Sequence, residues 1–141
     1  MTRTEIDALL ERHRLAFKRQ DAEALAADHA VEGTFESPAH GVVTGRAPIA
    51  DVYRYWFTAF PDLQITWDEA LIDGDRAAVF WRFAGTSRGP FFGVVGAGSR
   101  VELRGAAEYR FADGAIQNVR HIYDFSSMLV KTGVLKVKPA T

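Results

Sequence analysis

The chain has 141 residues, of which 48% are hydrophobic and 25% are charged, and its net charge is −1. This length and ordinary composition predict one domain over residues 1–141, with a core that needs neither metals nor disulfides. The near-neutral charge and the lack of a basic block argue against nucleic acid as a partner. The chain has no cysteine, which excludes disulfides, thiolate catalysis and cysteine-based zinc sites.

The amino-terminal stretch MTRTEIDALLERHR is charged and amphipathic, unlike a signal peptide. No apolar run reaches the roughly 20 residues that a membrane-spanning helix requires. We therefore expect a cytoplasmic protein with no membrane partner.

Three helices are predicted in the first half of the chain. Residues with helical spacing form the apolar face of the first helix: Ile6, Leu9, Leu10, His13 and Phe17. Asp21 can cap a second helix over residues 22–29. A short strand over 31–37 ends at Pro38, and a loop with Gly41 and Gly45 follows. The third helix begins near Pro48, ends before Pro61 and has a broad apolar face: Ile49, Val52, Tyr53, Trp56, Phe57 and Phe60.

The second half of the chain is predicted to form strands over residues 63–72, 76–86, 101–111 and 115–125. A glycine-rich loop lies over 89–98, and it has neither the lysine nor the strand–loop–helix context of a phosphate-binding loop. Helices followed by a meander of long strands indicate an α+β fold, with a curved antiparallel sheet and helices on one face. Three helices cannot cover so wide a sheet closely, so we expect a cavity between the two layers.

Strand 76–86 is apolar on both faces, because Ala78, Phe80 and Ala84 alternate with Val79, Trp81 and Phe83. A strand buried on both sides needs a second cover. A second copy of the same sheet is the simplest cover, and we therefore expect a two-fold symmetric homodimer.

The last predicted strand carries polar groups, Arg120, His121 and Asp124. Side chains alternate along a regular strand, so His121 and Asp124 point to opposite faces unless a β-bulge intervenes. The sequence leaves open which of the two faces the cavity. His13, in the apolar stripe of the first helix, points inward. The histidines are too scattered to predict a metal site: His13, His29, His40 and His121.

Several segments match a known family in order and spacing over residues 46–135: FPDL at 60–63, the GD turn at 74–75, GTSRGPFFGV at 85–94, RFADGAI at 110–116 and the final D…L..TGVL. With these segments the chain resembles the SnoaL-like polyketide cyclase (ester cyclase) family of the NTF2-like superfamily. The resemblance implies a cone-shaped barrel with a pocket between helices and sheet, no metal and no cofactor. It also implies that Asp124 is the acid/base in an intramolecular aldol closure, and we therefore expect Asp124 to face the cavity. Arg120 and His121 stand where members of the family commonly carry a Trp-Asp pair.

Ketosteroid isomerases of the same superfamily resemble the stretch from HRLAFKRQD to TFESPAHG. Their tyrosine and aspartate are replaced here by His13 and Ser37, so steroid isomerisation by that route is not expected.

Together, these observations predict a cofactor-independent acid/base enzyme for a small apolar or aromatic, carbonyl-bearing ligand. The predicted catalytic residues are Asp124, His121 and His13. The predicted substrate-binding residues are apolar or aromatic: Phe17, Phe35, Tyr53, Trp56, Phe57, Trp81 and Phe91. Two alternatives remain open at this point: a ligand-binding or dimeric scaffold protein without catalysis, and a hydrolase or dehydratase on the same fold.

Overall fold

The computed structural model describes residues 1–139 as four helices and nine strands. The helices are α1 (Arg3–Lys18), α2 (Ala22–Ala27), α3 (Arg46–Ala59) and α4 (Phe125–Lys131). The strands are β1 (His29–Ser37), β2 (Gly41–Thr44), β3 (Gln64–Trp67), β4 (Leu71–Asp73), β5 (Arg76–Thr86), β6 (Pro90–Phe91), β7 (Val94–Val95), β8 (Arg100–Ala112) and β9 (Ala115–Tyr123).

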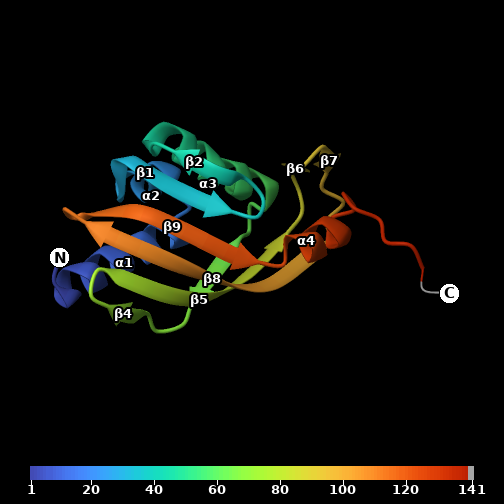
Figure 1. The fold of residues 1–141 in the computed structure, drawn as a ribbon. Helices are drawn as coiled ribbons and strands as arrows, with labels where there is room; N and C mark the ends of the chain where they lie inside the picture. The colour runs from blue at the N-terminus through green and yellow to red at the C-terminus, as the bar shows by residue number, and fades with distance from the viewer. Residues whose placement is uncertain (140–141) are drawn as a thin grey trace.

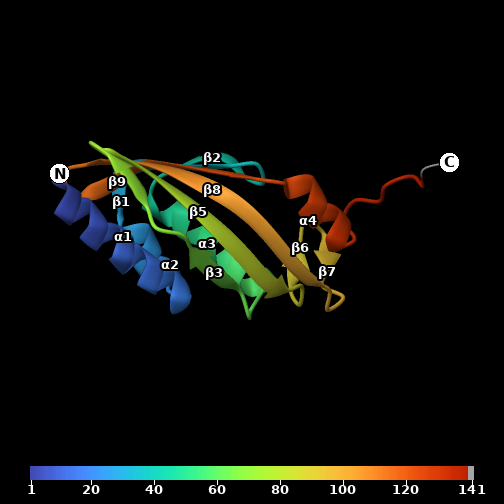
Figure 2. The ribbon, with the colours of Figure 1, turned by 90° about the horizontal axis from the view of Figure 1, so that it is seen from below.

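One curved sheet carries the fold, with strand order β2-β1-β9-β8-β5-β3 and β4 added beside β5. β1 and β9 run parallel, and the other neighbouring strands are antiparallel. The long strands β5 and β8 curve along the molecule (Figure 1), and α1, α2 and α3 cover one face of the sheet (Figure 2). The predicted α+β class, with three amino-terminal helices on a curved sheet, is confirmed.

Local capping explains where the first two helices begin. The Thr2 hydroxyl accepts from the Glu5 backbone N–H, and the Glu5 carboxylate accepts from the Thr2 N–H, so a reciprocal pair closes the start of α1. The Asp21 carboxylate accepts from the Ala24 N–H and starts α2. The predicted inner face of α1 is buried, with Phe17 partly exposed.

The structure differs from the predicted elements in four places. The loop after Pro38 contains β2, because Gly41 takes a left-handed φ of 65° and turns the chain back along β1. The predicted strand 63–72 is divided into β3 and β4, and the glycine-rich loop forms the small β6–β7 hairpin. The last strand ends at Tyr123, where the chain turns into α4, a helix that the sequence analysis did not predict.

Side chains alternate along β5 as predicted. Val79, Trp81 and Phe83 are buried beneath the helices, whereas Phe80 is 50% exposed on the outer face. On that outer face, Glu108 of β8 pairs with Arg76 and Arg120 from the two neighbouring strands. Within residues 1–139, no helix is long and apolar enough to cross a membrane.

Candidate functional site

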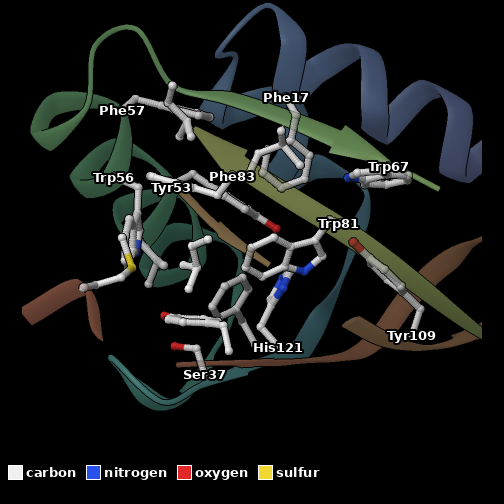
Figure 3. A pocket seen from close by; sticks show the side chains of 17 residues that line it. Phe17, Ser37, Tyr53, Trp56, Phe57, Trp67, Trp81, Phe83, Tyr109 and His121 are labelled. Carbon is white, nitrogen blue, oxygen red and sulfur yellow. The ribbon is translucent and has the colours of Figure 1, made fainter. Parts of the chain in front are cut away.

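A cavity lies between the helices and the concave face of the sheet (Figure 3). Its empty space, the open mouth included, is about 650 Å³, and the centre of a water-sized sphere can occupy about 80 Å³ of it. Its walls are mostly aromatic and aliphatic, and are formed by Phe17, Phe35, Ser37, Val52, Tyr53, Trp56, Phe57, Leu63, Ile65, Trp67, Trp81, Phe83, Leu103, Tyr109, His121, Tyr123 and Met128. Such a concave apolar site with few polar groups is typical of a small-molecule pocket.

All but one of the predicted substrate-binding residues lie in this wall: Phe17, Phe35, Tyr53, Trp56, Phe57 and Trp81. Phe91 is the exception. It is fully buried and packs against Trp56, Phe60 and Phe92, outside the set of lining residues. The β6–β7 hairpin that carries Phe91 folds back over the end of α3, where the Tyr55 hydroxyl accepts from the Phe92 N–H, and so takes Phe91 away from the cavity.

His121 is the titratable base in the wall of the cavity. Its ring packs at a tilt of 39° against Phe35, with centroids 5.1 Å apart, and lies 6.0 Å from the Trp81 ring. Burial, with a smaller contribution from the nearby His13, lowers the pKa of His121 to about 3. His121 is therefore a neutral imidazole at pH 7, partly exposed toward the cavity that it lines.

Asp124 does not face the cavity, so this expectation from the sequence is wrong. Its side chain is exposed, and its carboxylate accepts from the Ser127 N–H at 2.9 Å as the cap of α4. The regular alternation along β9 sends His121 and Tyr123 inward, and the chain leaves the strand before Asp124. Of the two candidates on the last strand, the structure places His121 in the cavity.

Trp81 contributes a hydrogen-bond donor beside His121. Its indole N–H is buried and has no partner within the described residues, and Figure 3 shows the indole nitrogen and the His121 ring pointing toward one another. Gly105 of β8 is paired with Trp81 of β5 and makes room for the indole ring, because a Cβ at position 105 would lie 2.3 Å from Trp81 Cζ2. The glycine therefore determines where this donor lies.

His13 lies behind the wall rather than in it. Its Nδ1 is 2.9 Å from an Asp28 carboxylate oxygen, and the Arg12 Nε donates to the other oxygen at 2.9 Å. Burial lowers the pKa of His13, although the Asp28 carboxylate opposes this shift. The hydrogen bonds from His13 and Arg12 lower the pKa of Asp28 despite its burial. Asp28 is thus ionised and His13 neutral at pH 7.

A second imidazole stands beside this pair. His29 is fully buried, its Nε2 lies 3.0 Å from the Tyr53 hydroxyl, and its ring centroid is 5.8 Å from that of His13. Burial lowers the pKa of His29 to about 3 and raises the pKa of Tyr53. Both groups are therefore uncharged at neutral pH. Within residues 1–139, no cluster of three or more His, Cys, Asp or Glu could hold a metal ion.

The sequence analysis missed Trp67, Tyr109 and Asp28. Tyr109 could have been found by alternation, since it stands opposite the polar side chains of its strand, and it lines the cavity together with Trp67. Asp28 gave no such signal. It meets His13 only because α2 returns the chain to α1, across 15 positions of sequence.

Comparison with solved structures places this architecture among related proteins. AclR of Streptomyces galilaeus, a proposed hydroxylase, is 26% identical with a TM-score of 0.83, over 98% of this chain and 87% of that chain. A proposed SnoaL-like polyketide cyclase from Jannaschia sp. CCS1 is 19% identical with a TM-score of 0.81, over 94% of each chain. IdmH of Streptomyces antibioticus, a proposed polyketide cyclase, is 24% identical with a TM-score of 0.75, over 90% of this chain and 97% of that chain.

A search of curated proteins finds no matching sequence. The family model for SnoaL-like polyketide cyclases matches residues 7–131, which is most of the chain and includes every lining residue of the cavity. The predicted resemblance is confirmed, and the chain belongs to the SnoaL-like polyketide cyclase family.

Proposed function

We propose that this protein is a cofactor-independent acid/base enzyme that acts on a small apolar or aromatic, carbonyl-bearing substrate. One observation carries the proposal: His121, a neutral imidazole, lines a cavity whose described wall contains no carboxylate and no lysine or arginine. A base in such a site can take a proton from a substrate that the aromatic walls hold by apolar contact.

The proposed reaction begins with proton transfer. The unprotonated nitrogen of His121 takes a proton from the carbon next to the carbonyl, and the electron pair of the C–H bond moves to the carbonyl oxygen as an enolate. The Trp81 N–H donates to that oxygen. Burial disfavours an isolated imidazolium, but the enolate beside it stabilises the charged ring. The enolate carbon then attacks a second carbonyl of the same substrate, a C–C bond forms, and the new alkoxide takes the proton back from His121.

A binding protein without catalysis is the second candidate. The apolar wall favours it, since aromatic side chains alone can hold a flat ligand. A hydrolase or dehydratase needs a water held by several polar groups, and the wall offers few. The two remaining candidates differ in turnover, not in ligand binding.

We also propose that two copies associate through the outer face of the sheet. Phe80 and Ile122, 50% and 58% exposed, lie at neighbouring positions of this face on either side of Ala106. Beside these two residues, Glu108 pairs with Arg76 and Arg120. The patch therefore carries both positive and negative charge, and in a two-fold arrangement the charges of one copy can face opposite charges of the other. Sedimentation at micromolar concentration should show a dimer that Phe80→Glu converts to monomer. A monomeric native protein would contradict this.

The proposed function is tested with 1-indanone in D₂O, by NMR observation of hydrogen exchange at the carbon next to its carbonyl. We expect the protein to accelerate exchange beyond an equal concentration of free imidazole. Tryptophan fluorescence reports binding independently, because Trp56, Trp67 and Trp81 line the cavity. Binding without accelerated exchange would reject the enzyme and support the binding protein. Absence of both would reject the cavity as a ligand site.

A further inference from the structure

We infer that the end of the cavity lined by Phe17, Tyr53, Trp67 and Tyr109, here called the α1 end, binds a hydroxyl group of the ligand, which donates to His13 Nε2. This subsite rests on the proposed function only in sharing its cavity. It is separate from the Trp81–His121 pair, whose aromatic neighbours are Phe35 and Tyr123.

The hydrogen-bond partner of His13 determines which ring nitrogen carries the proton. The ionised Asp28 carboxylate can only accept hydrogen bonds. Nδ1 of His13, 2.9 Å from that carboxylate, must therefore carry the proton and donate it. In the neutral ring the proton is then absent from Nε2, which has a lone pair and is an acceptor. The Arg12 Nε, bound to the second carboxylate oxygen, keeps Asp28 oriented for this bond.

The neighbours of the ring place His13 next to the cavity wall. Nδ1 and Nε2 lie on opposite sides of an imidazole, so Nε2 points away from Asp28. The other aromatic neighbours of the ring, besides His29, are the four side chains of the α1 end, with centroids 5.2 to 6.4 Å away. All four line the cavity. His13 thus stands immediately behind the wall at this end.

Nε2 of His13 is buried and has no hydrogen-bond partner within the described residues. A buried polar atom without a partner is costly and uncommon in native proteins. Of the two tyrosines beside the ring, Tyr53 pairs with His29 at 3.0 Å, and no hydrogen bond joins Tyr109 to Nε2. Because His13 has no exposed surface, a donor from the ligand would satisfy Nε2 once a side chain of the wall turns aside to admit it.

An unprotonated nitrogen selects the chemical class of this donor. It accepts from a phenol or enol hydroxyl and repels the lone pairs of an ether, a carbonyl or a carboxylate. The substrate class therefore carries an acidic hydroxyl in addition to the carbonyl that His121 and Trp81 address. Asp28 behind the ring would stabilise the imidazolium as the hydroxyl proton moves toward Nε2.

The test compares the 5- and 6-hydroxy derivatives of 1-indanone with the matching methoxy derivatives, by tryptophan fluorescence. For the native protein we expect at least one hydroxy isomer to bind about tenfold tighter than its methoxy counterpart, the usual scale for one net hydrogen bond. In Asp28→Asn the amide can donate to Nδ1, which moves the ring proton to Nε2, so the hydroxyl preference should fall to about one. Glu11→Gln is the matched control, because Glu11 is an exposed carboxylate on the helix that carries His13, and this variant should keep the tenfold preference.

Ring ¹⁵N NMR of the native protein gives a readout that does not depend on the variant folding. Nε2 of His13 should resonate as an unprotonated nitrogen and should shift with the hydroxy but not with the methoxy compound. Equal binding of hydroxy and methoxy pairs, or a protonated Nε2, would overturn the subsite and leave the proposed function standing. Failure of every compound to bind would overturn both.

Discussion

Two imidazoles stand at the cavity, His13 buried behind its wall and His121 partly exposed in it, and they differ in what packs behind them. The Asp28 carboxylate pairs with His13 and accepts a second hydrogen bond from Arg12. The tautomer and orientation of the His13 ring are therefore fixed. His121 packs between the Phe35 and Trp81 rings, and no carboxylate pairs with it among the described residues. A ring with a charged partner is suited to hold one hydrogen bond in one direction. A ring held only by aromatic contacts can exchange its proton with a ligand.

The two rings therefore divide the expected work between positioning and proton transfer. Replacing His121 should change the exchange rate more than the free energy of unfolding, because the replacement leaves no hydrogen-bond partner of His121 unsatisfied. Disturbing the Arg12–Asp28–His13 chain should affect stability and ligand preference more than rate. The following predictions test this division.

The largest effect is expected for His121→Gln. Glutamine can fill the space and keep a polar group in the cavity, but it cannot take a proton at neutral pH. Exchange of 1-indanone should slow by about 10²- to 10⁴-fold, the usual contribution of a positioned base, while its binding changes little. Asp124→Asn is the matched control on the next exposed polar position and should retain full exchange. An unchanged rate in His121→Gln would remove the histidine from the mechanism.

Gly105→Ala should disturb the His121 region through Trp81. The added Cβ would lie 2.3 Å from Trp81 Cζ2 and 2.5 Å from Cη2, so the indole must move. Overpacking of this kind costs about 1–3 kcal/mol of unfolding free energy, and ligand binding should weaken with it. Adding Trp81→Phe, which lacks both of these ring atoms, should restore much of the stability. The same loss in the double variant would contradict the proposed steric cause.

Acid should destabilise the protein through its neutral histidines. The pKa of His121 and the pKa of His29 are each lowered to about 3 from 6.5. Between these values the unfolded chain binds more protons than the folded one, so stability falls as pH falls. Each histidine should lower the free energy of unfolding by about 1 kcal/mol between pH 6 and pH 5. Urea unfolding at both pH values measures this loss, and the loss should be about 1 kcal/mol smaller in His121→Gln than in the native protein. An equal loss in both proteins would mean that His121 already titrates normally.

The smallest effect is expected for Arg12→Met. Arg12 is 61% exposed although its partner Asp28 is only 5% exposed, so solvent screens the pair and the loss should be about 0.5–1 kcal/mol. Arg14→Met is the matched control, because the Arg14–Glu11 pair is exposed on both sides and should cost less. A larger loss for Arg14 would argue against a structural role of the Asp28 chain.

The sequence was informative where a pattern repeats. Helical spacing on α1 and alternation on β5 located His13, Phe17 and Trp81 on inner faces, and the family motifs indicated the fold. The pattern failed where one side chain changes the direction of the chain. Asp124 caps α4 instead of continuing β9, so its carboxylate leaves the cavity. Asp28 could not be predicted as a partner of His13, because their contact depends on how α2 returns to α1.

The most direct test of the account is the protonation and ligand contact of His121, followed by ¹⁵N NMR of its ring in a pH titration with and without 1-indanone. The account predicts a neutral ring from pH 7 down to about pH 4, in keeping with the pKa of about 3 for His121, and ring shifts when the cavity fills. A ring that titrates near the ordinary histidine pKa of about 6.5, and that does not respond to the ligand, would contradict a buried acid/base group at this position.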